Sequence, residues 1–192
     1  NTFSGVGNFI LDNKSSKLDM DINFSKFDIS FLSPLGKKSI SNIRGFLDGN
    51  VNIWGDISKL QNTGLLGLSN SGFSIPYLNT DYILSNETQI NLYNNILEFT
   101  PTDLIDLIYN TKASIQAKFS HLNFKEWEMD LIVDSEGILL LNKIETSDAL
   151  FYGEGFLSGD ILIKGPIKNP KLELVGLTAP GTSIKIPWKD TQ

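Results

Sequence analysis

The stretch Trp127-Glu128-Met129-Asp130-Leu131-Ile132-Val133-Asp134 decides the fold class. Trp127, Met129, Leu131 and Val133 occupy every second position, and three of the other four residues of the stretch are acids. Successive side chains of a β-strand point to opposite faces of the sheet. The alternation therefore predicts a strand with one apolar face and one polar face.

The same period of two recurs in residues 17–24, 49–55, 113–120 and 157–164. Gly, Asn, Asp and Pro separate such segments at intervals of about ten residues, which is typical of consecutive antiparallel strands. Residues 102–109 have partly helical spacing, but a strand is favoured there, and residues 138–141 form a dense apolar run that suits a buried strand. The predicted apolar faces comprise Leu18, Met20, Ile22, Phe24, Val51, Ile53, Ile115, Phe119, Trp127, Met129, Leu131, Val133, Leu157, Ile161 and Ile163.

One-sided strands are compatible with two architectures. In a β-sandwich, two sheets bury their apolar faces against each other. In an open, curled sheet, the apolar face lines a cavity instead. The alternation alone does not separate these two outcomes.

An internal repeat bears on the architecture. Residues 45–57 (GFLDGNVNIWGDI) reappear as residues 155–167 (GFLSGDILIKGPI), and each copy leads into a Leu-rich strand and an Ile-Pro-aromatic end. The unit is about 40 residues long, with copies 110 residues apart. A repeated unit with its apolar face preserved indicates a sheet that extends by adding strands, with glycines at bends or bulges. The alternative is that the glycines mark ordinary strand ends.

Composition argues against several function classes. The 192 residues carry a net charge of −6, which disfavours nucleic-acid binding. There is no cysteine and a single histidine, His121, for which a structural or solvated role is expected. Lys37 and Lys38, the only adjacent basic pair, are expected in a solvated loop. We therefore predict no enzyme activity, no metal and no cofactor.

Several segments together resemble the TamB family, the translocation and assembly module subunits of Gram-negative bacteria, particularly of Bacteroidota. The resemblance is clearest over residues 44–192, whereas residues 1–43 share only the strand pattern. The segments that carry it are residues 45–55, GFSIPYLNTDY at 72–82, HLNFKEW at 121–127, ALFYG at 149–153 and GTSIKIP at 181–187.

The resemblance implies an all-β fold: an elongated, curled antiparallel sheet, or β-taco, with an apolar interior. It implies one continuous segment over 1–192 of a longer periplasmic protein that bridges the inner and outer membranes. The inner-membrane anchor is expected outside this segment, and the expected partners are phospholipid acyl chains and an outer-membrane barrel of the TamA class.

The expected function is to hold or conduct acyl chains along a hydrophobic groove in outer-membrane biogenesis. In a second reading, free strand edges act as a scaffold or chaperone for outer-membrane proteins by β-augmentation. A third reading is a closed β-sandwich binding module. A lipid-filled apolar groove favours the first reading, and a polar groove with long free edges favours the second.

Overall fold

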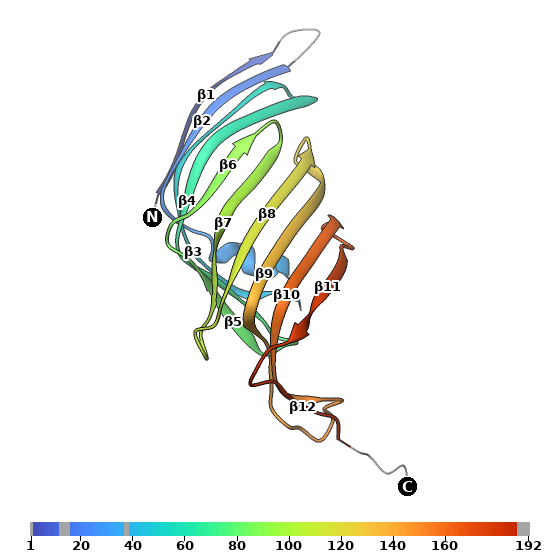
Figure 1. Cartoon of the computed structure of the whole chain (residues 1–192). Helices are drawn as coiled ribbons and strands as arrows, with labels where there is room; N and C mark the ends of the chain where they lie inside the picture. The colour runs from blue at the N-terminus through green and yellow to red at the C-terminus, as the bar shows by residue number, and fades with distance from the viewer. Residues whose placement is uncertain (1, 12–15, 37–38, 188–192) are drawn as a thin grey trace.

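The computed structural model describes residues 2–11, 16–36 and 39–187, which form a single antiparallel sheet of 12 strands (Figure 1). The predicted all-β, curled antiparallel sheet is confirmed. One short 3-10 helix, η1 (Ser30–Gly36), joins β2 to β3. The strands are β1 (Thr2–Leu11), β2 (Ser16–Asp28), β3 (Ser41–Asp56), β4 (Lys59–Ile75), β5 (Thr80–Leu84), β6 (Thr88–Tyr93), β7 (Ile96–Asp106), β8 (Lys112–Leu122), β9 (Lys125–Lys143), β10 (Tyr152–Pro166), β11 (Lys171–Thr178) and β12 (Ser183–Lys185).

The strands lie side by side nearly in chain order, as the regular turn spacing predicts. The path runs β1-β2-β3-β4-β5-β7-β8-β9-β10-β11. β5 and β6 share one place between β4 and β7: residues 72–75 of β4 pair with β5, and residues 63–68 pair with β6. β11 and β12 likewise share the far side of β10. The architecture is thus one long sheet rather than two stacked sheets.

Bulges bend the strands in their middle parts. β2 has an extra residue between Phe24 and Phe27, and β7 has one between Phe99 and Thr102. The β7 bulge contains Pro101, which has no backbone N–H to offer a neighbouring strand. Bulges increase local twist and bending. The strands are accordingly curved in Figure 1, and η1 lies behind β8 and β9 in that view.

The internal repeat is visible in the backbone. β3 and β10 each contain a glycine at the equivalent position, with φ of 135° at Gly49 and 141° at Gly159. A Cβ at Gly49 would lie 2.2 Å from the Leu65 carbonyl oxygen, and one at Gly159 would lie 2.3 Å from that of Val175. Only glycine fits such a backbone at this separation. Both glycines therefore permit a close strand approach inside the sheet and do not mark strand ends.

Two clusters of buried apolar side chains lie on the sheet. The first contains Val51, Leu66, Leu68, Ile90 and Leu92. The second contains Tyr82, Leu104, Ala113, Val133 and Ile138.

Tyr82 connects two strands that are not neighbours in the sheet. Its hydroxyl donates a hydrogen bond of 2.7 Å from β5 to the Leu139 carbonyl of β9. Burial raises the pKa of Tyr82 to about 12, so this donor keeps its proton at neutral pH. The sheet thus curls far enough at this end for β5 to meet β9.

Three local expectations remain. Residues 102–106 are strand, as favoured, and a turn follows Asp106. Ile138 and Leu139 are buried within β9, as predicted. Lys37 and Lys38 lie outside the described residues.

Candidate functional site

Strand register places the predicted apolar residues on one face of the sheet. Residues paired directly across antiparallel strands project to the same side. On β2 and β3, Met20 faces Ile53 and Ile22 faces Val51. On β8, β9 and β10, Ile115 faces Val133, which faces Ile161.

A single row joins these two groups. From β3 to β9 it runs through Val51, Gly64, Leu92, Leu97, Phe119 and Met129, each paired with the next. No member of this row is charged. We call this side of the sheet the apolar face; it carries all fifteen residues predicted from the sequence.

Sequence reasoning missed several members of the apolar face. A second row passes through Leu66, Ile90, Phe99, Ala117 and Leu131, and Leu66, Ile90 and Phe99 are the members of this row that were not predicted. Their signal was present in the sequence, since Leu66/Leu68, Ile90/Leu92 and Leu97/Phe99 also alternate with a period of two. These segments are short, so the pattern is weaker there.

Most of the apolar face is only partly covered. Val51, Val133 and Leu157 are buried, whereas the other twelve predicted residues keep partial exposure. Coverage is least at the two edges of the sheet, where Phe3 on β1 and Leu172 on β11 are exposed. The face thus remains reachable from both edge strands.

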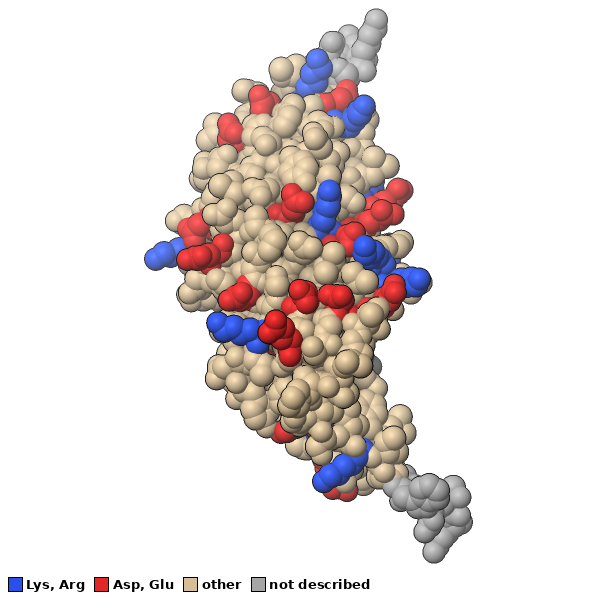
Figure 2. All heavy atoms as spheres, viewed as in Figure 1, with Lys and Arg blue, Asp and Glu red and all other residues tan. Residues whose placement is uncertain are grey.

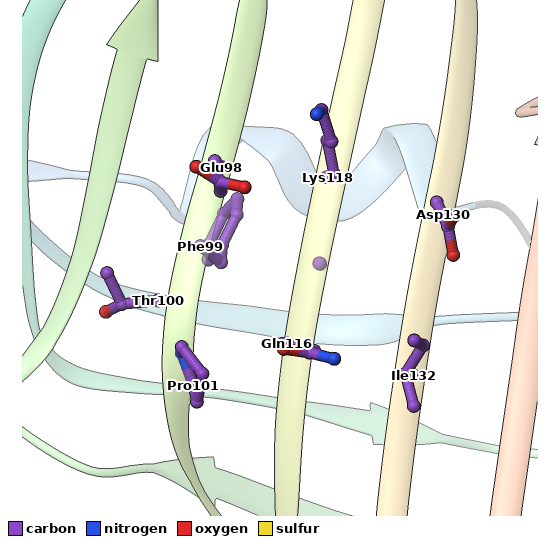
Figure 3. A pocket seen from close by; sticks show the side chains of 9 residues that line it. Glu98, Phe99, Thr100, Pro101, Gln116, Lys118, Asp130 and Ile132 are labelled. Carbon is purple, nitrogen blue, oxygen red and sulfur yellow. The ribbon is translucent and has the colours of Figure 1, made fainter.

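Charged side chains gather on the opposite face. Glu98, Lys118, Asp130 and Lys164 are paired in order across β7 to β10. The Lys164 ammonium lies 3.4 Å from the Asp130 carboxylate. Figure 2 shows charges of both signs mixed on the surface turned towards the viewer. The side chains of Glu98, Lys118 and Asp130 project from neighbouring strands in Figure 3, with η1 behind the sheet.

Two shallow hollows also occur on the sheet. One, of about 330 Å³, surrounds the β7 bulge at Pro101 and is lined by Glu98, Lys118 and Asp130 among others (Figure 3). The other, of about 420 Å³, lies near Asn70 and Asn86. Neither involves a residue of the predicted set.

Two buried polar side chains, His121 and Asn62, interrupt the apolar face. The Phe124 backbone N–H donates to His121 Nδ1 at 3.0 Å, and the Asn62 side-chain amide lies 3.2 Å from Nε2. The His121 ring also stacks on Phe124 and contacts Trp127. Burial lowers the pKa of His121. The histidine is therefore a buried, hydrogen-bonded group, which is the structural role expected for it.

The structure contains few groupings suited to catalysis. Within residues 2–11, 16–36 and 39–187, no three His, Asp or Glu side chains converge as metal ligands would. Asp19 and Asp21 lie on the side of the sheet opposite the apolar face, which we call the charged face. Both accept hydrogen bonds from the Asn52 amide. The described part of the chain also has no helix of the length and hydropathy needed to span a membrane.

Comparison with models of protein families, with curated proteins and with solved structures found no match for this chain. The functional argument therefore depends on the geometry of the apolar face.

Proposed function

We propose that the apolar face binds the acyl chains of phospholipids. The observation that carries this proposal is the uncharged row that crosses the sheet from β3 to β9, in which Leu97, Phe119 and Met129 stay partly exposed while Val51 and Leu92 are buried. An apolar surface left partly exposed, with no charge in the row that crosses it, marks a surface that an apolar partner covers.

The energy scale favours such a role. Burying one CH₂ group contributes about 0.8 kcal/mol, so a sixteen-carbon tail exposed to water costs on the order of 12 kcal/mol. A continuous apolar row removes most of that cost and needs no directional polar contact. A charged side chain within the row would oppose binding, because covering an unpaired charge costs several kcal/mol.

The direction of the row suits an extended acyl chain, because the row crosses the strands from one to the next. Each strand that it crosses adds about 4.8 Å to its length, which is the distance between neighbouring strands. Because the face is exposed at both β1 and β11, a tail can enter or leave at either edge.

The family resemblance extends this proposal to a cellular role. In a TamB-like protein, the segment would conduct phospholipid between the inner and outer membranes, in the periplasm. It would act together with an outer-membrane barrel of the TamA class. The support for this step is the five sequence segments and the curled all-β sheet.

A second candidate function has an observation of its own. The described side chains of β1 are all exposed, and β1 carries no charge. Uncharged edge strands can accept a further strand, so β-augmentation of nascent barrel strands is an alternative use of the same sheet. It predicts that introducing Lys at Val6 reduces client-strand binding but leaves acyl binding unchanged.

Photo-crosslinking tests the main proposal. The purified chain is irradiated with a diazirine-bearing fatty acid, and the labelled residues are identified by mass spectrometry. We expect label on Met129 and Ile163, and none on their opposite-face neighbours Ile132 and Leu162. Label distributed equally over the two faces would contradict the proposal, as would an unlabelled protein. Intact-mass analysis for co-purified phospholipid provides an independent measurement.

A further inference from the structure

We propose that one end of the sheet is a docking surface for a lipid bilayer. This surface, the distal tip, consists of the exposed residues Tyr77, Ile144, Leu150, Ile184 and Ile186. The inference deepens the proposed function, because it states where the acyl-binding sheet meets a source of lipid.

Three chain segments build the distal tip. The first is the turn between β4 and β5, which the Asn79 amide ties to the Asn142 carbonyl. The second is the loop of residues 144–151 between β9 and β10. The third is β12, which pairs with the start of β10 and places Ile184 opposite Gly153. Figure 1 shows this loop and β12 projecting beyond the rest of the sheet.

The distal tip exposes several large aliphatic side chains together. Leu150 is 77% exposed and Ile186 is 80% exposed. Single exposed apolar residues are normal on protein surfaces, whereas a group of them marks an interaction site. No other described segment covers these side chains.

Aromatic rings and lysines form the border of the aliphatic group. The Lys143 ammonium lies 4.6 Å from the centre of the Tyr77 ring and 4.7 Å from that of Phe151. The Lys185 ammonium lies 5.8 Å from the Tyr152 ring. Exposed aliphatic side chains together with Tyr rings and long lysines form the combination found at membrane–water interfaces. This combination favours a bilayer over a protein partner.

Charges of both signs lie near the distal tip. Lys143 and Lys185 are accompanied by Glu145 and Asp148 of the neighbouring loop and by Glu154, which is paired with Ser183 of β12. Insertion of apolar side chains, rather than attraction to anionic lipid, should therefore drive binding. The surface is thus suited to a zwitterionic bilayer.

The distal tip is continuous with the apolar face through two strands. β9 and β10 carry Leu131, Val133 and Ile161 in their middle parts, and they end at the tip. A bilayer bound there would lie at the end of the strands that carry the proposed acyl site.

Flotation with phosphatidylcholine vesicles tests the inference. The double variant Leu150→Ser/Ile186→Ser removes two tip side chains. Its matched control is Leu177→Ser/Val6→Ser, because those residues are 78% and 80% exposed on the edge strands. We expect the tip variant to lose vesicle partitioning on the order of tenfold or more, and the control to keep it. Adding phosphatidylglycerol should change partitioning little.

Site-specific labelling gives a second readout. The chain has no cysteine, so Leu150→Cys and Leu177→Cys each accept a single environment-sensitive dye. Only the dye at position 150 should shift to the blue when vesicles are added. Failure of the wild type to float, equal loss in both double variants, or a dimer that disappears in the tip variant would overturn the inference.

Failure of the docking surface and failure of the acyl site give different results. The tip variant should still bind a soluble fatty-acid probe in the absence of vesicles. A chain that floats but binds no probe would refute the acyl site alone, and one that binds the probe but does not float would refute the docking surface alone.

Discussion

Placing one charge on the apolar face should abolish most acyl binding, and β10 offers a matched pair of positions for this test. Ile163 lies on the apolar face, opposite Leu131 and Leu172. Leu162, the preceding residue, lies on the charged face, opposite Ile132 and Glu173. Both side chains are partly exposed. Ile163→Asp and Leu162→Asp thus differ mainly in the face that receives the carboxylate.

The expected magnitude follows from two contributions. Full burial of an isoleucine side chain contributes about 1.5–3 kcal/mol, and an acyl chain over the half-exposed Ile163 gains roughly half of that. Covering an unpaired carboxylate adds a cost of at least about 1–3 kcal/mol, unless the chain avoids it. A combined loss of about 2–4.5 kcal/mol corresponds to roughly 30- to 2,000-fold weaker binding.

Titration with a fluorescent fatty acid measures this loss, and circular dichroism and urea unfolding check that both variants fold. Leu162→Asp should bind within about threefold of the wild type, since that face already carries Glu98, Lys118 and Asp130. Equal affinities for the two folded variants would show that the apolar face does not bind the probe.

Three further predictions concern stability. Tyr82→Phe should lower the free energy of unfolding by about 1–2 kcal/mol, because it leaves the Leu139 carbonyl without its hydroxyl donor. Tyr77→Phe, at an exposed position, should change the free energy of unfolding little. Urea denaturation of both variants measures the difference. Gly49→Ala should lower the free energy of unfolding by about 2 kcal/mol or more, because the added Cβ would meet the Leu65 carbonyl at a φ of 135°. Gly67→Ala should change the free energy of unfolding by no more than about 1 kcal/mol. Equal melting temperatures for the two variants would argue against the close strand approach. The pKa of His121 is lowered in the folded chain, so as the pH falls below about 6.5 the unfolded chain binds a proton before the folded chain does. The contribution of His121 to the free energy of unfolding should therefore be complete above that pH and decrease as the pH falls towards the folded-state pKa. His121→Gln should flatten this part of the stability–pH curve, and an unchanged slope would refute the assignment.

Much of the apolar face could be predicted because its signal is local. In residues 127–134, alternation alone assigns each side chain to a face, and the register of β9 with β8 and β10 agrees with that assignment. The structural role of His121 was also predictable from the absence of partner residues for catalysis or metal binding. The partners themselves, Asn62 and the Phe124 backbone, were not, because Asn62 is 59 positions away in the chain.

Other features depend on contacts between distant residues. The 3-10 helix at Ser30–Gly36 was not expected, since its short apolar stretch has no clear period. The division of one strand position between β5 and β6 was also not foreseen, because it depends on which parts of β4 each strand meets. The distal tip is likewise a product of three separate segments. Parts of each, residues 72–82, 149–153 and 181–187, had been singled out in the sequence, but nothing in the sequence indicated that they meet.

The amino-acid order alone determined that the chain forms β-strands with one apolar face, because side-chain direction in a strand follows from its period of two. It also marked Gly49 and Gly159 as equivalent positions of a repeat, whereas the structure showed that both permit a close strand approach. Only the tertiary structure decided that the strands join one curled sheet rather than two stacked ones. That choice depends on long-range strand pairing and on bulges, and the alternation within a single strand determines neither of them.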